Sequence, residues 1–182
     1  MKQVVRVLAL FLIAISFSGC LSSLNPFKST TFVVNEGYLS IGKLNENIAK
    51  QMPLSQKVDT NEIKIVNTKI YAANDKKHLI VESDFIFTSF EIPEGTPVIA
   101  KFQADLTYNP QTKEFKLDNL KLIDIKFLKE ELLEYVSPLQ KRFIVDTLQY
   151  LLKKIVLHKS LKQLRTIKSI EAQNGKIKVI FN

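Results

Sequence analysis

Hydrophobic and polar positions alternate with a period of two through the middle of the chain. The most regular run covers residues 97–108, and residues 62–72, 78–90 and 114–127 show the same preference for β-branched and aromatic side chains. A period of two with one polar face is typical of an antiparallel sheet with one solvated side. The apolar phase of residues 114–127 slips twice, which predicts bulges and a strongly curved sheet.

Two segments have helical periodicity instead. Ser40 is a candidate N-cap for a short helix that reaches about residue 51 and is stopped by Pro53. The longest helical pattern covers residues 128–157, and Ser-Pro-Leu-Gln at residues 137–140 resembles a capping box, which predicts a kink or break there. Its apolar residues form two faces. Either the curved sheet encloses both faces, or one of them lines a groove for an apolar ligand.

Two further strand-like pieces, residues 166–172 and 176–181, flank an Asn-Gly turn, and residues 30–34 form a short β-prone run. These elements together predict an α+β fold. We expect a highly curved antiparallel sheet wrapped around a long, kinked C-terminal helix, with a short N-terminal helix in addition.

The first 20 residues have a different character. A short basic stretch precedes an apolar run at residues 7–17, which is too short to cross a bilayer and is typical of an export signal. Small residues then precede Cys20, the single cysteine, in a pattern that resembles the lipobox of bacterial lipoproteins, although Phe17 replaces the usual Leu. The alternative is a secretory signal with an unmodified, buried cysteine. We predict a lipoprotein signal peptide at residues 1–19, a lipidated tether at 20–31 and a single lipid-binding-like α+β domain at 32–182.

Lipidation of Cys20 implies a location in the cell envelope, lipid-anchored and facing the periplasm. By resemblance to the lipoprotein sorting rule, Leu21 after the cysteine favours the outer over the inner membrane. The net charge of +8 is basic, but an envelope location argues against nucleic acid as a partner. We expect the membrane to be a partner through the lipid anchor, whereas a protein partner is not identified.

A cluster of cations near the C-terminus suggests a second membrane contact. No acidic residue occurs from Thr147 to Ile170. We expect the cations of this stretch to dock on lipid headgroups, or else to form a solvated helix end whose charge complements the helix dipole. They are Lys153, Lys154, Lys159, Lys162, Arg165 and Lys168.

Several stretches together resemble the YceB-like bacterial lipoproteins, a family without an assigned activity. They are the lipobox, Tyr38-Leu39-Ser40 before a helix that ends at Pro53, residues 104–108 turning into 115–124, and the closing residues 170–181. The resemblance implies a long helix wrapped by a curved sheet, similar to one unit of the tubular lipid-binding superfamily, whose members hold lipids between helix and sheet. It supplies no catalytic residues.

An apolar ligand would lie among side chains of mixed size on the predicted strands and helix. The candidates are Phe85, Phe87, Phe102, Leu106, Leu132, Val136, Phe143 and Tyr150. The alternative is that all eight are ordinary core residues.

Residues that carry familiar chemistry are scarce. The two histidines have no metal-ligand neighbours at helical spacing, and neither a Gly-x-Ser-x-Gly elbow nor a glycine-rich phosphate loop occurs. We therefore expect no enzyme activity, metal or cofactor.

The expected function is that of a membrane-anchored envelope lipoprotein that binds or shuttles a lipid or other hydrophobic ligand. The alternative is a structural or interaction lipoprotein with a packed core and a protein partner. A continuous apolar cavity would favour the first, and an exposed apolar patch without one would favour the second.

Overall fold

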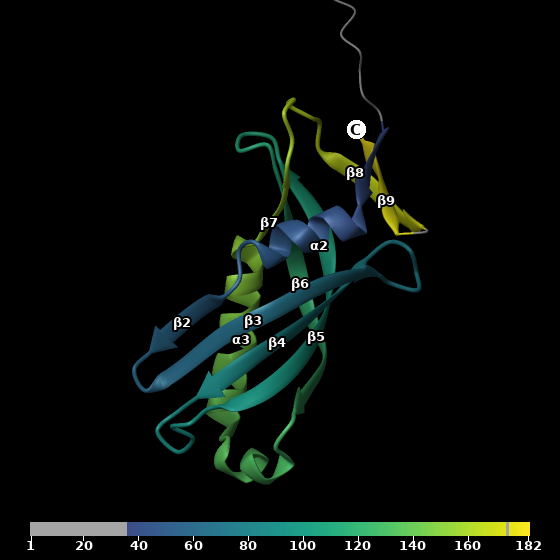
Figure 1. Ribbon diagram of the computed structural model, residues 1–182. Helices are drawn as coiled ribbons and strands as arrows, with labels where there is room; N and C mark the ends of the chain where they lie inside the picture. The colour runs from purple at the N-terminus through teal and green to yellow at the C-terminus, as the bar shows by residue number, and fades with distance from the viewer. Residues whose placement is uncertain (1–35, 174) are drawn as a thin grey trace, which may run out of the picture. The chain divides into compact units, whose positions relative to one another are not determined.

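Two antiparallel sheets account for most of the computed structural model, which describes residues 36–173 and 175–182 (Figure 1). Cys20, the predicted signal peptide and tether, and the β-prone run at 30–34 lie outside these residues. In chain order the elements are β1 (Glu36–Ser40), α2 (Ile41–Ala49), β2 (Leu54–Val58), β3 (Asn61–Ala72), β4 (Leu79–Thr88), β5 (Thr96–Asn109), β6 (Glu114–Phe127), the 3-10 helix η1 (Glu130–Tyr135), α3 (Pro138–Lys154), β7 (Val156–Lys159), β8 (Ile167–Gln173) and β9 (Lys176–Phe181).

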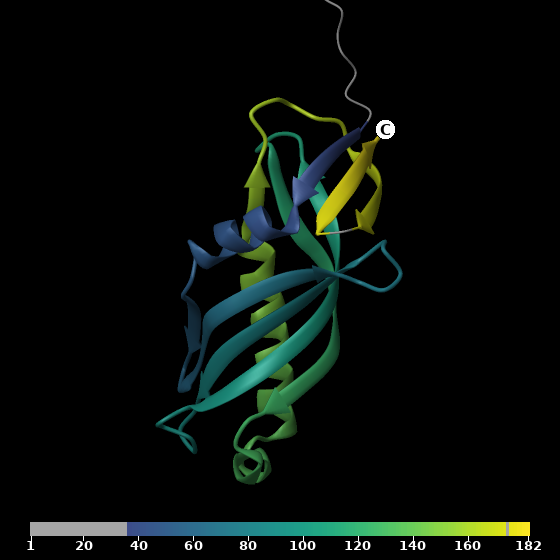
Figure 2. The same ribbon diagram turned by 45° about the vertical axis from the view of Figure 1, so that its right-hand side comes forward.

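The larger sheet has six strands in the order β2-β3-β4-β5-β6-β7. Its central strands are β4 and β5. The longest strands, β5 and β6, have 14 residues each and pair from Val98 with Phe127 at one end to Asn109 with Glu114 at the other. The pairing of β5 with β6 shifts register between Lys101 and Phe102 and again between Gln103 and Asp105. The bulges predicted from the phase slips of residues 114–127 are therefore confirmed, and Figure 2 shows the resulting bend of these strands.

The smaller sheet has the strand order β1-β9-β8. The Asn-Gly prediction holds here, because β8 and β9 pair as a hairpin and Gly175 adopts a φ of +73°, a conformation that glycine accepts readily. A hydrogen bond of 2.8 Å from the Ala172 amide to the Lys76 carbonyl connects this sheet to the turn between β3 and β4.

The predicted α+β fold with a long, kinked C-terminal helix is wrong. The described residues are mostly β, and their three helices are short. The predicted helix at 128–157 divides into η1, the straight helix α3 and the strand β7. Helical periodicity missed this division because β7 is a short edge strand whose apolar residues also fit a helical face.

Local chemistry explains where α3 begins and ends. The predicted capping box is confirmed: the Gln140 amide donates to Ser137 Oγ at 3.2 Å, and the Ser137 amide donates to Gln140 Oε1 at 2.8 Å. Ser137 itself is extended, so the chain does not continue a helix from η1 into α3. At the other end Ile155 is extended, and the following residues pair with β6.

The hydrophobic core lies between α3 and one face of the larger sheet. Ile144, Leu148 and Leu152 of α3 are fully buried in the same cluster as Phe85 of β4 and Phe102 of β5. The opposite face of the sheet mixes polar and apolar side chains. It contains cross-strand ion pairs such as Glu82–Lys101, whose charged atoms are 2.9 Å apart, beside partly exposed apolar residues such as Ile80 and Ile99. Phe102 and its neighbours are therefore closed off from solvent by α3.

The helix α2 and the turn that follows it contact both lateral edges of the larger sheet through side-chain amides, from Asn45 in the helix and from Gln51 just after it. Asn45 accepts a hydrogen bond from the Ile70 amide (2.8 Å) and donates to the Ile70 carbonyl (3.1 Å). Gln51 makes the same two bonds to Val156, at 3.0 and 2.8 Å. Because β2 pairs with β3 only as far as Ile65, and β7 is the last strand, these backbone groups have no strand partner on that side. The two amides therefore take the place of neighbouring strands.

Candidate functional site

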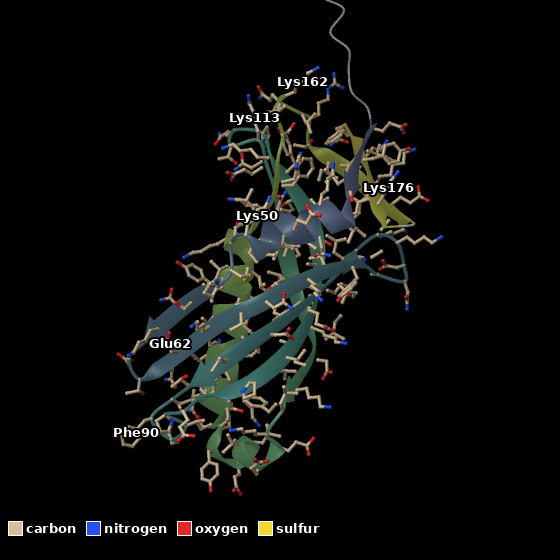
Figure 3. All side chains as sticks on the ribbon, viewed as in Figure 1. Lys50, Glu62, Phe90, Lys113, Lys162 and Lys176 are labelled. Atoms are coloured by element: carbon tan, nitrogen blue, oxygen red, sulfur yellow. The ribbon has the colours of Figure 1, made fainter. Side chains whose placement is uncertain are left out.

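The connection between β7 and β8, residues 160–166, forms the most exposed apolar point of the described surface. Leu161 is 97% exposed. Lys159 precedes it, and Lys162 and Arg165 follow it in the same connection. Figure 3 shows Lys162 and Lys113 close together at this end of the molecule. We call the connection, together with Lys113, Lys159 and Lys168, the basic end.

Hydrogen bonds hold the first half of this connection to the larger sheet. The Ser160 amide donates to the Lys113 carbonyl at 2.8 Å, and Ser160 Oγ donates to the Lys162 carbonyl at 2.7 Å. The Leu164 amide donates to the hydroxyl of Tyr108, a buried residue of β5, at 3.0 Å. Leu161 is therefore exposed on a braced loop.

The second half of the connection is held by the C-terminal residue. Arg165 Nη1 donates to the Asn182 carbonyl at 3.0 Å, and the Asn182 amide donates to the Thr166 carbonyl at 3.0 Å. A third bond of 3.0 Å joins the Asn182 side-chain amide to Thr166 Oγ1. These bonds tie the end of β9 to the start of β8, so both ends of the loop are fixed.

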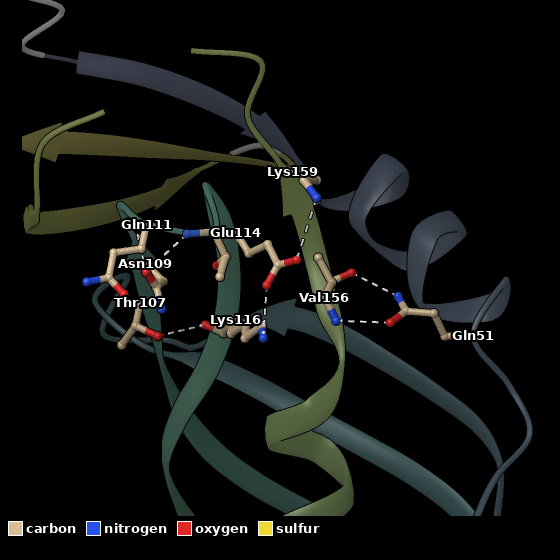
Figure 4. A network of polar contacts seen from close by, with 9 residues as sticks. Gln51, Thr107, Asn109, Gln111, Glu114, Lys116, Val156 and Lys159 are labelled. Carbon is tan, nitrogen blue, oxygen red and sulfur yellow. Dashed lines mark hydrogen bonds and ion pairs between the residues drawn. The ribbon is translucent and has the colours of Figure 1, made fainter. Parts of the chain in front are cut away.

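One carboxylate balances part of the positive charge at this end. Glu114 Oε2 lies 3.0 Å from the Lys116 ammonium, and Glu114 Oε1 lies 4.0 Å from that of Lys159 (Figure 4). The hydrogen bond from Lys116 is the main cause that lowers the pKa of Glu114. Desolvation has the opposite effect, because the Glu114 side chain is only 16% exposed. Within the described residues Lys113, Lys162 and Lys168 form no ion pair, so their charges face solvent.

The structure separates the six predicted headgroup-docking residues into two groups. Lys153 forms an ion pair with Asp118 at 2.8 Å, and the Lys154 ammonium lies 3.9 Å from the centre of the Tyr150 ring. Both therefore interact with neighbours at the end of α3. The other four predicted cations lie in β7, the following connection or β8. They are Lys159, Lys162, Arg165 and Lys168.

Sequence reasoning missed two residues of the basic end. Lys113 belongs to the turn between β5 and β6 and reaches this end only through strand pairing. Leu161 follows the Lys159-Ser160 pair directly, and an apolar residue within a basic run is a signal that could have been recognised.

The eight predicted ligand-lining residues lie in different environments. Five of them are buried in the core: Phe85, Phe87, Phe102, Leu106 and Val136. Leu132 and Phe143 are partly buried against the core, whereas Tyr150 is 51% exposed. Leu106 also lines an open hollow of about 410 Å³ beside Tyr108 and Lys168. The assignment of these residues to a ligand site stays a prediction.

A small apolar pocket lies beside the basic end, where the smaller sheet meets β6 and β7. It has a volume of about 130 Å³ and is lined by Leu39, Phe115, Leu164, Val179 and Phe181, among others. Ser160 and Leu164 of the connection also border this pocket. It can accommodate only a few methylene groups, such as the end of an acyl chain.

Another group of polar residues surrounds His78. Its Nδ1 lies against the Asp75 carboxylate, and its Nε2 is 3.5 Å from Asp105. The hydrogen bond from His78 is the main cause that lowers the pKa of Asp75. Asp105 and His78 line an open hollow of about 400 Å³ with Asn119. No nucleophilic serine or cysteine lines this hollow, and no group of three or more His, Cys, Asp or Glu in residues 36–173 and 175–182 could hold a metal ion.

No family model matches the chain, and no curated protein is significantly similar to it. The resemblance to the YceB-like lipoproteins therefore stays a prediction. In the part of the chain that the structure describes, no helix has the length and apolar character needed to cross a membrane.

Proposed function

We propose that the protein is a membrane-anchored lipoprotein of the cell envelope, and that its basic end binds lipid at an anionic membrane surface. The observation that carries this proposal is Leu161, which is 97% exposed on a braced loop and surrounded by cations. A solvated leucine has no stabilising role within the fold. Inserted among lipids, it would contribute up to about 1.5–3 kcal/mol.

Charge would add to this contribution. Each Lys or Arg near an anionic leaflet adds about 1 kcal/mol of attraction. Lys113, Lys159, Lys162 and Arg165 all lie within the basic end, and only Lys159 is close to a carboxylate there. A braced loop also loses little conformational entropy on binding, because its conformation is already fixed.

The position of β1 is consistent with an orientation in which the basic end faces the membrane. The strand β1, the first coloured element of the chain, lies at the same end as the connection between β7 and β8 (Figures 1 and 2). The 16 peptide units from Cys20 to Glu36 span at most about 55 Å. A lipid anchor at Cys20 would keep the domain within this distance of the bilayer, and the loop would supply the second contact that stable membrane association needs.

The pocket beside the basic end favours lipid as the ligand. Its lining is mainly apolar, with His158 and Ser160 as polar members, and its volume of about 130 Å³ suits the end of an acyl chain better than a whole lipid. We infer that a lipid would bind with its headgroup near the cations and only part of its chain inside the protein.

Vesicle co-sedimentation tests the proposal. The chain from residue 21 onward retains every described element and lacks the acylated cysteine. We expect it to bind phosphatidylcholine vesicles weakly and vesicles that also contain phosphatidylglycerol at least tenfold more strongly. Leu161→Asp and Lys162→Glu should each weaken this binding severalfold.

Matched controls come from the opposite end of the molecule. Leu139 is 81% exposed, and Lys129 is also exposed. Leu139→Asp and Lys129→Glu should leave vesicle binding unchanged. Binding that ignores anionic lipid content, or that falls equally in all four variants, would refute the proposed docking.

A further inference from the structure

The end of the molecule opposite the basic end also exposes large apolar side chains. Phe90, in the loop between β4 and β5, is 80% exposed and is labelled in Figure 3. Leu139, at the start of α3, is 81% exposed. Leu128, Leu133 and Tyr135, in and around η1, are also exposed. Exposed apolar residues that gather at one place are typical of an interaction site.

These residues come from two segments, 89–95 and 128–140, which hydrogen bonds join into one surface. Gln140 Nε2 donates to Glu91 Oε2 at 3.1 Å, and Ser89 Oγ donates to the same oxygen at 3.0 Å. The Leu128 amide donates to the Pro97 carbonyl at 3.0 Å. We call the exposed part of these two segments the acidic end.

The charge of the acidic end is opposite to that of the basic end. The two segments contain five carboxylates and one cation, Lys129. The carboxylates are Glu91, Glu94, Glu130, Glu131 and Glu134. Among the described residues none of the five forms an ion pair. Two cations follow this end along α3. Lys141 is exposed and forms no ion pair with a described residue, and Arg142 lies 3.7 Å from Asp146.

The carboxylates and exposed apolar side chains of the acidic end together favour one class of binding partner. Unpaired carboxylates repel the anionic surfaces of membranes and nucleic acids and attract cationic groups. The exposed apolar side chains between them require apolar contacts from the same partner. We propose that the acidic end is the docking site for a partner protein that presents a basic segment with an apolar stripe.

The length of the central strands separates this site from the membrane contact. β5 runs from Thr96, next to the acidic end, to Asn109, next to the basic end. Fourteen residues of strand cover up to about 46 Å. A partner could therefore bind the acidic end while the basic end lies on a bilayer, although the docking site does not depend on membrane binding.

Site-specific photocross-linking of the full-length chain in its natural host tests the proposal. Benzoylphenylalanine is incorporated at Phe90 or Leu139, and at Leu161 and Tyr71 as exposed control positions. We expect the same protein adduct from Phe90 and Leu139 and not from Tyr71 or Leu161. Mass spectrometry should locate the adduct in a segment of the partner with net positive charge and an apolar face.

Charge reversal provides the second readout. Glu131→Lys should lower the yield of this adduct by about threefold or more, because it reverses one of the attracting charges. Glu46→Lys, the same change at an exposed position of α2, should leave the yield unchanged. Equal thermal unfolding of both variants would show that neither change acts through folding.

Several outcomes would overturn the proposal. They are an adduct with a second copy of this chain, an adduct with lipid, a cross-linked segment that is acidic, the absence of any adduct from Phe90 and Leu139, and a yield that Glu131→Lys does not lower. Vesicle binding is measured separately, so failure here and failure of the membrane proposal can be distinguished.

Discussion

The basic and acidic ends of this protein each expose a leucine almost completely, yet they differ in what surrounds it. Leu161 is flanked by Lys159 and Lys162. Leu139 is followed by Lys141 and Arg142, but it belongs to an end whose two segments contain five carboxylates that form no ion pair among the described residues. Exposed apolar residues that gather at one place are typical of interaction sites, and the charges around them favour one chemistry of partner over another. The same residue type thus favours a bilayer at one end and a protein at the other.

The largest expected effect comes from the core that both ends share. Phe102 lies in the middle of β5 and is fully buried, so Phe102→Ala should lower the free energy of unfolding by about 3–5 kcal/mol. Urea unfolding measures this loss. Tyr71→Ala, at an exposed position of β3, should change the free energy by less than about 0.5 kcal/mol.

A small loss in the free energy of unfolding of Phe102→Ala would contradict the view that the basic and acidic ends are two separate sites on one packed core. It would mean that the space around Phe102 is incompletely filled, and an interior lipid site would then explain the protein better than two separate surfaces. A large loss of free energy with a single cooperative unfolding transition would support this view, because both ends would then depend on one packed interior.

A smaller and more local effect should follow from removing one edge amide. Gln51→Ala leaves the amide and carbonyl of Val156 without their partner, which should cost about 1–3 kcal/mol. Hydrogen exchange should become faster in β7, next to the basic end, and stay unchanged in η1.

A matching change at the acidic end is Ser137→Ala, which removes the cap of α3. It should lower the free energy of unfolding by about 1 kcal/mol, with faster hydrogen exchange in the first turn of α3. Faster hydrogen exchange at both ends of the molecule in either variant would contradict the independence of the basic and acidic ends.

The smallest expected effect is the part of the pH dependence of stability that Glu114 contributes at the basic end. The pKa of Glu114 is lowered in the folded protein, chiefly by the hydrogen bond from Lys116. Its contribution to stability is therefore complete above the unfolded pKa of about 4.3 and is lost as the pH falls through the lower, folded value. Thermal unfolding at pH 7 and pH 3 should show a larger acid-induced loss in the wild type than in Glu114→Gln. Equal losses in both proteins would exclude this contribution.

Most strands could be predicted from the sequence because their information is local. The alternation of residues 97–108 and the Asn-Gly turn depend on neighbours along the chain, and the structure has strands at β5, β8 and β9 accordingly. The cap at Ser137 is also local and was predicted correctly. The division of the strands into two sheets depends on pairing between distant segments, such as β1 with β9, which no local pattern specifies.

The candidate surfaces show the same limit. Four of the six predicted cations lie in or next to the connection between β7 and β8, because they are near each other in sequence. Lys113 was missed because strand pairing brings it there. The acidic end was missed entirely, because it combines a loop after β4 with residues about 40 positions later in the chain, and only the folded sheet brings Glu91 to Gln140.

The side-chain amides of Asn45, in α2, and of Gln51, just after it, impose a constraint that the amphipathic pattern of the helix does not reveal. Asn45 and Gln51 each imitate a peptide group of an absent strand, one on β3 and one on β7. At these two points a foreign strand could not extend the larger sheet without first displacing an amide. Pairing of a partner's strand with the larger sheet is thereby blocked at these points, and two partly exposed polar residues, one in α2 and one just after it, have a structural role.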